Sequence, residues 1–288
     1  MSAEKRKPHR SADAAEFSGL IGRLRILLAN DDGYDAVGLR SLEPVLAEFG
    51  EVWVVAPDRE RSATSNAMSI REELTLRQVG ERRFSLTGYP ADCVNLGLHS
   101  DLFPDFDLVV SGMNHGPNLG DDVHYSGTVA GARQAAVHQL RGVAVSYGDY
   151  EPTQQQLERA ARWLGVWLKS NLAELGTGIV YNINYPGESA ASDAPLPEVR
   201  YTYQGKRTYH DDYFVNPETA GYANDAAGDE WRVRIKGTDF GHIKQDHSDS
   251  EAVLAGFVSI TPLSTFTTDR RELRKWFHKT RIKQARRA

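Results

Sequence analysis

The sequence predicts an α/β protein with a mostly parallel sheet flanked by helices. Short apolar runs of strand length alternate along the chain with segments in which apolar residues recur at helical spacing. The first strand–helix–strand unit takes about thirty residues, which suits a parallel βαβ unit. Hydrophobic residues make up 40% of the 288 residues, so the chain has enough apolar material to bury a core.

The individual elements follow from these patterns. Residues 25–29 form an apolar run that stops at Asn30-Asp31-Asp32-Gly33, as a buried strand ending in a turn does. Apolar residues then recur at helical spacing from Leu39 to Phe49, and Gly50 stands where this helix would end. Further along we expect a strand at 52–56, a hairpin at 69–87, a helix at 91–98, a strand at 107–111, a polar loop at 112–125, a helix at 129–140, a strand at 143–146, a helix at 152–168 and a strand at 179–183.

The alternation fails after Pro186. Residues 187–230 hold Pro, Gly, Asp and Tyr without a clean period, which suggests extended hairpins or an oligomerisation arm. A late strand is expected at 256–261 and a basic amphipathic helix at 269–282. The predicted organisation is a flexible leader at 1–24, an α/β domain at 25–268 that includes an oligomerisation arm at 187–235, and a basic helix or tail at 269–288.

The charge is unevenly distributed. The whole chain carries −5, which excludes a uniformly cationic nucleic-acid coat protein. Residues 270–288 carry +8 and residues 1–25 carry +3, so the body between them is strongly acidic. The N-terminus lacks the apolar stretch of a signal peptide, no apolar run is long enough for a membrane span, and Cys93 is the single cysteine. These features predict a cytoplasmic protein that is not bound to membranes.

Polar side chains cluster just after the predicted strands. In open parallel sheets, ligands bind beyond the carboxyl ends of the strands, so Asp31 and Asp32 after the first strand should share a rim with Asn114 after the third. Two adjacent carboxylates repel each other unless a cation or water separates them. Oxygen-rich ligation favours a hard ion such as Mg²⁺ or Mn²⁺. The alternative is that the Asp-Asp-Gly segment is only a turn and a helix cap.

A second candidate site follows the polar loop. Ser126 is a plausible N-cap of the helix expected at 129–140, and the free amides at that end would accept a phosphate oxygen. The alternative is an ordinary capped helix. Walker A, GxGxxG and GxSxG patterns are absent, which disfavours a P-loop, a dinucleotide site and a hydrolase serine elbow.

Together, these segments resemble the survival protein E (SurE) family of metal-dependent nucleotidases. The longest matching block, at 109–132, is highly specific. In the family's order the matching segments are ILLANDDG (26–33), VVAPDRERSATSNA (54–67), YPADCV (89–94), VVSGMNHGPNLGDDVHYSGTVAGA (109–132), GTDF (237–240) and GFVSITPL (256–263).

The resemblance implies a Rossmann-like fold and a set of site residues. One divalent ion per subunit (Mg²⁺ or Mn²⁺, with Co²⁺ as a third candidate) would be held by two aspartates, a serine and an asparagine, and a phosphate cradle would lie nearby. The family forms dimers and tetramers by exchanging C-terminal arms. Such an arm would explain why residues 187–230 lack a regular strand or helix period. The matching metal ligands are Asp31, Asp32, Ser62 and Asn114, and the matching phosphate-binding residues are Asn118, Ser126, Gly127 and Thr128.

The predicted function is therefore hydrolysis of nucleoside 5′-monophosphates to nucleoside and phosphate. Further candidate substrates are 3′-monophosphates and short polyphosphate. Asp32 is the candidate catalytic residue, because it could take a proton from the attacking water as well as bind the ion. The alternative is a nucleotide sensor, or a polyanion-binding or RNA-binding protein that uses the basic tail. A solvated, frayed terminus is the simpler interpretation of that tail, so nucleic acid is an unlikely partner.

Other polar residues near the site allow two interpretations each. Asp121 and Asp122 could orient the site residues, or could form a solvated loop pair. His115 and His124 could donate to phosphate, although a loop histidine more often bonds locally. Arg61 could attract an anionic substrate or neutralise the acidic rim.

Overall fold

The computed structural model describes residue 19 and residues 22–187, 195–209, 213–215, 233–235 and 240–285, and for 214–215, 240 and 278–285 it describes the backbone alone. Within this part of the chain, nine strands form one sheet in the order β3-β4-β2-β1-β5-β6-β7-β13-β8. These strands are β1 (Leu24–Ala29), β2 (Gly50–Pro57), β3 (Leu76–Gly80), β4 (Arg83–Leu86), β5 (Leu108–Asn114), β6 (Arg141–Tyr147), β7 (Ile179–Tyr185), β8 (Val199–Tyr201) and β13 (Val258–Ser264).

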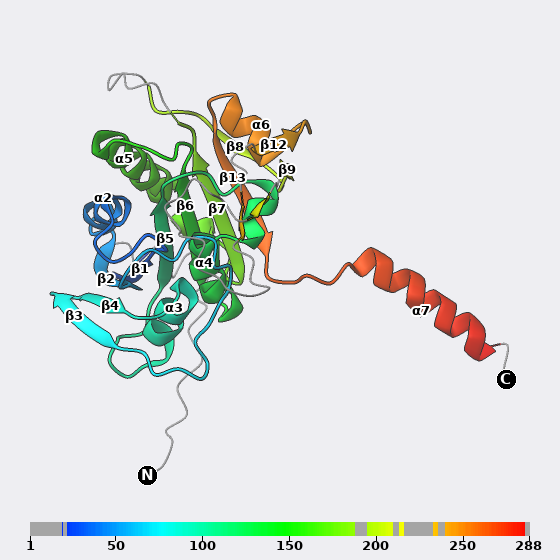
Figure 1. Ribbon diagram of the computed structural model, residues 1–288, viewed down its shortest axis with the longest axis horizontal. Helices are drawn as coiled ribbons and strands as arrows, with labels where there is room; N and C mark the ends of the chain where they lie inside the picture. The colour runs from blue at the N-terminus through cyan, green and yellow to red at the C-terminus, as the bar shows by residue number, and fades with distance from the viewer. Residues whose placement is uncertain are drawn as a thin grey trace, which may run out of the picture.

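The sheet is mostly parallel, as predicted. The run β4-β2-β1-β5-β6-β7 is parallel throughout, and antiparallel pairs occur at β3–β4 and β7–β13. The helices are α2 (Val37–Leu46), α3 (Pro90–His99), α4 (Gly127–Val137), α5 (Gln154–Asn171), α6 (Asp249–Leu254) and α7 (Arg270–Ala285), with 3₁₀ turns η1 (Gly120–His124) and η2 (Leu172–Glu174). Figure 1 shows the helices packed around the sheet, with α7 projecting away from the body.

Alternation along β1 produces two separate cores. Ile26 and Leu28 face the layer made by α2 and α5, whereas Leu27 and Ala29 face the layer made by α3 and α4. Both faces of the central strands are therefore apolar, which is why these strands appear in the sequence as continuous apolar runs. Trp163 and Trp167 stack in the first layer and are buried. Cys93 is buried in the second, and burial raises the pKa of its thiol.

β5 extends beyond the predicted strand, to Asn114, after a shift in its register with β6. At this shift Gly112 has φ +137°, and a Cβ built on it would lie 2.2 Å from the carbonyl oxygen of Val145. Only glycine fits this close approach of two backbones. The irregularity carries Asn114 to the end of the strand, on the rim where a ligand is expected.

The region after β7 contains short antiparallel pairs. β9 (Lys206–Tyr209) pairs with β12 (Phe240–Ile243), and β10 (Tyr213–Val215) pairs with β11 (Val233–Ile235). These antiparallel pairs agree with the expected hairpins, but β11 and β12 lie beyond residue 230, and the oligomerisation arm stays a prediction. The sequence did not predict β8 and α6, which are three and six residues long. Residues 237–239 of the GTDF segment and most of the leader lie outside the described residues.

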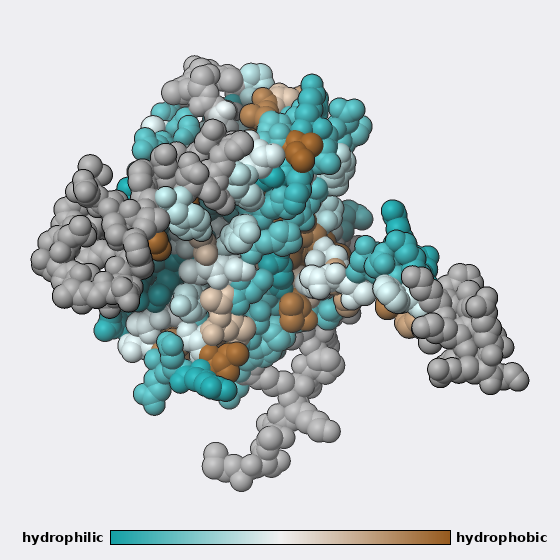
Figure 2. Space-filling model, turned by 45° about the vertical axis from the view of Figure 1, so that its right-hand side comes forward, coloured by the Kyte–Doolittle hydropathy of each residue, from teal (hydrophilic) through white to brown (hydrophobic). Residues whose placement is uncertain are grey.

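The predicted C-terminal helix is present as α7. Figure 2 shows the described part of α7 at the right-hand side and scattered apolar residues on a mainly hydrophilic face of the body. Scattered apolar residues of this kind are normal for a protein surface. Within the part of the chain that the structure describes, no helix has the length and hydropathy needed to cross a membrane.

The side chain of Asp249 connects separate backbone segments by hydrogen bonds. Its carboxylate is fully buried and accepts backbone hydrogen bonds from Gly120 (2.8 Å), Gly205 (2.9 Å) and Ser250 (2.8 Å). In Asp249→Asn one oxygen becomes an NH₂ group that faces an N–H donor, so we expect the free energy of unfolding to fall by about 2–4 kcal/mol. Urea denaturation measures this, with exposed Asp246→Asn as the control. If the free energy of unfolding falls no more in Asp249→Asn than in Asp246→Asn, the Asp249 carboxylate does not stabilise these segments.

Candidate active site

Asn30, and not the aspartates, makes the turn after β1. Its Nδ2 donates to the carbonyl oxygen of Gly33 (2.8 Å) and its Oδ1 accepts from the Gly33 N–H (3.2 Å). The turn therefore forms without the side chains of Asp31 and Asp32. Asp31 accepts a hydrogen bond from the Thr128 hydroxyl, and Oδ2 of Asp32 is buried without a hydrogen-bond partner. The simple turn interpretation explains Asn30 but leaves the two carboxylates unexplained.

Both carboxylates hold protons more tightly than usual in the absence of a cation. Burial raises the pKa of Asp31 to about 6, and the Thr128 hydroxyl opposes this shift. Burial raises the pKa of Asp32 to about 7, with further contributions from the neighbouring charges of Asp31 and Glu60. A protein gains little from two buried carboxylates that repel each other, unless a positive ion joins them.

The other predicted ligands lie in the same cavity. Asp31, Asp32, Ser62 and Asn114 all line one pocket of about 710 Å³. Asn114 donates its Nδ2 to the carbonyl of Gly116 (2.8 Å), which leaves its Oδ1 for another partner. Among the residues that the structure describes, no three His, Cys, Asp or Glu side chains form a metal-binding group. The donors are thus two carboxylates and neutral oxygens, which fits a hard divalent ion and not a structural zinc.

The N-terminus of α4 also contributes to the wall of this pocket. Ser126 caps the helix, because its Oγ accepts from the N–H of Val129 at 3.0 Å, and Ser126 also lines the pocket. A helix N-terminus carries free amides and partial positive charge, so it suits an anion. Ser126 is therefore both an N-cap and part of the cavity wall.

Gly127 and Thr128 lie behind Asp31. A Cβ on Gly127 would be 2.8 Å from the Cβ of Asp31, so this glycine allows the close approach. Thr128 is fully buried, and its hydroxyl bonds to Asp31. Orienting Asp31 is a role of Thr128 that the sequence did not reveal, since the two residues are 97 positions apart.

Asn118 is buried at the edge of the same pocket. Its Nδ2 donates to the Ser146 hydroxyl at 2.7 Å, and its backbone N–H donates to Oδ1 of Asn184 at 2.7 Å. Asn182 donates to its carbonyl oxygen at 2.8 Å. These bonds from β6 and β7 hold the segment after β5 against the rim.

Asp121 and Asp122 do not orient Asn114 or the helix cap by their side chains, and they are not simply solvated. Asp121 accepts from Lys206 Nζ and from the Arg207 N–H, both at 3.0 Å. Asp122 accepts from Arg207 Nε at 2.7 Å and from the Tyr209 hydroxyl at 2.8 Å. The pair thus fastens β9 to η1, a long-range contact that neither interpretation from the sequence included.

This contact should protect β9 from proteolysis. Asp122→Ala removes charge-assisted bonds to Arg207 and Tyr209, so we expect tryptic cleavage after Lys206 or Arg207 to accelerate at least about tenfold. Mass spectrometry of timed digests measures the rate. Asp105→Ala, an exposed aspartate, is the matched control. Equal cleavage in both variants would show that the contact does not hold β9 in place.

Arg61 has structural partners beside the site. Its guanidinium donates to the carbonyl of Thr87 at 3.1 Å, lies 3.6 Å from Asp58 and sits over the Tyr89 ring. His115 lines the pocket, and burial lowers its pKa. The exposed His124 lies 3.3 Å from the amide nitrogen of Gln204, a residue 80 positions away in the chain.

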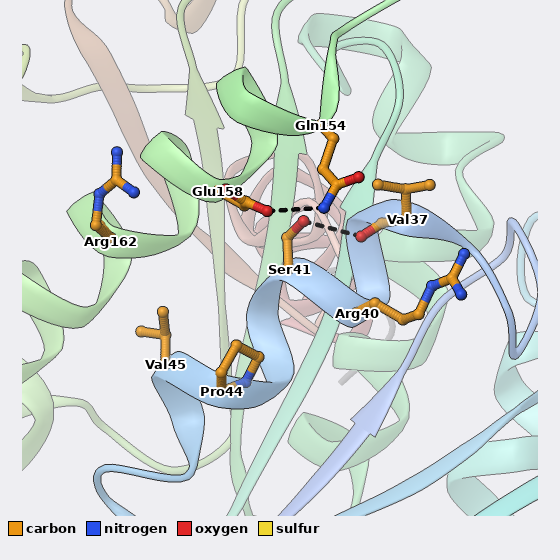
Figure 3. Close-up of a pocket in the computed structure, with 8 residues that line it drawn as sticks. All are labelled: Val37, Arg40, Ser41, Pro44, Val45, Gln154, Glu158 and Arg162. Carbon is orange, nitrogen blue, oxygen red and sulfur yellow. Dashed lines mark hydrogen bonds between the residues drawn. The ribbon is translucent and has the colours of Figure 1, made fainter. Parts of the chain in front are cut away.

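A second cavity, between α2 and α5, differs chemically from the first. It has a volume of about 460 Å³ and its lining has one carboxylate, Glu158, which accepts a hydrogen bond from Gln154 at 2.8 Å. Figure 3 shows that bond, and also the Ser41 hydroxyl bonded to the carbonyl of Val37. Because its lining holds a single carboxylate, this cavity has no counterpart of the aspartate pair.

The raised pKa values predict how the stability of the metal-free protein depends on pH. The ordinary aspartate value is 3.8, so between about pH 4 and 7 the folded state binds more protons at Asp31 and Asp32 than the unfolded state does. These groups therefore favour folding at low pH, and that contribution is lost as pH rises through about 6 to 7. We expect the thermal midpoint of EDTA-treated protein to fall from pH 5 to 7.5, and to fall less steeply in Asp32→Asn. Equal slopes would contradict the raised pKa of Asp32.

Known proteins resemble this chain along most of its length. The family model of survival protein SurE matches residues 26–211. The 5′-nucleotidase SurE of Leptospira interrogans serovar copenhageni is 39% identical over 246 residues, covering 85% of this chain and 94% of the relative. The 5′-nucleotidase SurE of Geotalea daltonii is 38% identical over 263 residues, covering 88% and 99%.

A solved structure agrees with the sequence relatives. The crystal structure of the SurE protein from Aquifex aeolicus superposes with a TM-score of 0.72 at 33% identity, covering 87% of this chain and 97% of that one. The resemblance seen in the sequence is confirmed, and the predicted enzyme class agrees with the name that the relatives carry. The chain belongs to the survival protein SurE family.

Proposed function

We propose that this protein is a divalent-metal-dependent phosphomonoesterase that hydrolyses nucleoside 5′-monophosphates to nucleoside and phosphate. The observation that carries the proposal is the buried, unpartnered Oδ2 of Asp32, which lies beside Asp31 in a cavity that also reaches the N-terminus of α4. A cation site and an anion site in one cavity are what metal-assisted hydrolysis of a phosphate ester needs. The names of the relatives supply the substrate class.

Each residue has a defined task in this reaction. Asp31, Asp32, Ser62 and Asn114 would hold the ion, and the Thr128 hydroxyl orients Asp31. When bound, the ion would lower the pKa of a water molecule and polarise a phosphoryl oxygen. The carboxylate of Asp32 can also take a proton from the attacking water, because it lies in the same cavity as the other ligands.

The cap of α4 serves the phosphoryl group. The Gly127 N–H at this cap can donate a hydrogen bond to the phosphoryl oxygens, where negative charge develops during the reaction. The Thr128 and Val129 N–H groups, in contrast, already bond to Asp31 and to Oγ of Ser126. Asn118, which also lines the cavity, is held in place by its bonds to β6 and β7. Fixed donors of this kind do not need to reorganise at the moment of reaction.

The finer features of the proposal come from the family resemblance. They are the use of Mg²⁺ or Mn²⁺, with Co²⁺ as a third candidate, activity on 3′-monophosphates and short polyphosphate, and assembly into a homodimer or homotetramer. Oxygen ligands discriminate weakly between these ions, so availability would select among them. A cytoplasmic location stays a prediction from the single cysteine.

A metal-by-substrate screen tests the proposal. Metal-stripped protein is incubated with adenosine 5′-monophosphate and Mg²⁺, Mn²⁺ or Co²⁺, and free phosphate is measured. We expect release of phosphate with at least one ion and none with EDTA. Activity that survives complete removal of divalent ions would contradict the proposed mechanism.

The basic tail supports a second candidate function, the binding of polyanions. α7 projects from the body (Figure 1), and its described side chains at 270–277 are exposed. Lysine and arginine clusters attract polyanions in a way that weakens with salt. A truncation that ends at Asp269 should lose this affinity, whereas an unchanged affinity and salt slope would show that the tail is a solvated terminus.

A further inference from the structure

Two exposed tyrosines line the active-site cavity. Tyr125 and Tyr150 both belong to its wall, and each is 58% exposed. Aromatic side chains commonly line small-molecule sites, so both rings are available to contact a ligand. Tyr125 directly precedes Ser126, the cap of α4, and so lies next to the proposed phosphate site.

The two rings are held in place from outside the cavity. Tyr125 packs edge-on against Tyr209 of β9, with ring centroids 6.4 Å apart. The Tyr150 ring covers Gly116, where a Cβ would come within 2.5 Å of the ring carbons, and its hydroxyl shares a hydrogen bond with Arg207. The partners of both rings are therefore fixed by β9 and the loop after β5, and the rings are positioned before any ligand arrives.

We propose that Tyr125 and Tyr150 form an aromatic platform on which the base of the nucleotide stacks while its phosphate binds at the cap of α4. This inference rests on the proposed function and adds the part of the substrate that the metal and phosphate sites do not recognise. The cavity volume of about 710 Å³ accommodates a whole nucleoside monophosphate. Stacking on tyrosine needs only the flat face of a base, so the platform recognises a nucleoside and not a particular base.

The platform also gives β9 a role in substrate recognition. Arg207 and Tyr209 bind Asp122 and contact the two platform rings, so the β9 contact with η1 continues into the base site. A change in β9 would then alter recognition of the nucleoside without touching the metal ligands.

Paired substrates test the platform. The ratio of kcat/KM for adenosine 5′-monophosphate to that for ribose 5-phosphate, which lacks the base, is measured in the wild type, Tyr125→Ala and Tyr150→Ala. We expect each alanine variant to lower this ratio about 5- to 150-fold, chiefly through KM, because one base–aromatic stack is lost. Tyr125→Phe and Tyr150→Phe keep the flat ring and should restore the ratio.

Tyr201→Ala is the matched control, because Tyr201 is 62% exposed on β8 and is not part of the cavity lining. It should leave both substrates unaffected. If the kcat/KM ratio is the same in both alanine variants as in the wild type, the base does not stack on these tyrosines. That result would not affect the proposed hydrolysis of the phosphate ester. If the wild type hydrolyses neither substrate, the proposed function fails, and calorimetry with adenosine 5′-monophosphate decides the platform separately: weaker binding in the alanine variants supports it and equal binding overturns it.

Discussion

Asp32→Asn is expected to lower kcat/KM for adenosine 5′-monophosphate by about 10³-fold or more, even with excess Mg²⁺ or Mn²⁺. The substitution keeps the size of the side chain but removes its charge and its capacity to accept a proton. In the wild type, Oδ2 of Asp32 is buried without a partner, so an ion is the group that would balance it. The amide cannot do this at the same strength.

Metal binding provides a second measurement that does not depend on turnover. Calorimetry with Mn²⁺ should show weaker binding in Asp32→Asn, and Asp31→Ala should lose both binding and turnover. The control is Asp35→Asn, which alters an exposed aspartate only three residues away, paired with Arg40 at 3.2 Å. Full activity in Asp32→Asn would remove Asp32 from its assigned role.

Gly127→Ala is expected to have the second largest effect on activity. The added Cβ would lie 2.8 Å from the Cβ of Asp31 and 2.9 Å from its Oδ2, so either the helix cap or the carboxylate must move. Displacing a reacting or ligating group by about 1 Å can cost about 100-fold in rate. We therefore expect kcat/KM to fall about 100-fold and Mn²⁺ affinity to fall about 10- to 100-fold.

A glycine with free space around it makes the matched control. At Gly80 in β3 the nearest atom to an added Cβ is 3.5 Å away, which is an ordinary contact. Gly80→Ala should keep its activity and its Mn²⁺ affinity. If Gly127→Ala behaves in the same way, the close approach of α4 to Asp31 does not control the site.

Local sequence patterns were sufficient to predict the layers of helices and strands and some of the residues that line the cavity. Apolar runs predicted the strands at the centre of the sheet, because a strand buried on both faces is mostly apolar. The rule that parallel strands end on one rim brought Asp31, Asp32 and Asn114 together in advance, and the structure places them in one cavity. Ser126 was recognised as a cap from its position before a helical pattern.

Contacts between distant segments could not be predicted in this way. The bond from Thr128 to Asp31, the fastening of β9 by Asp122, and the two tyrosines around the cavity each join residues that are far apart in the chain. No local propensity encodes such pairs. The strand β8 has three residues and α6 has six, so both are too short to produce a clear periodic pattern in the sequence.

The sequence by itself determined the α/β layers, the family and the chemical character of the site: two carboxylates, neutral oxygens and a helix cap. Only the tertiary structure decided which carboxylate oxygen lacks a partner, how Asp31 is oriented and which aromatic rings line the cavity. The physical reason is that periodicity records whether a residue is buried, whereas the partner of a buried group depends on how distant segments pack.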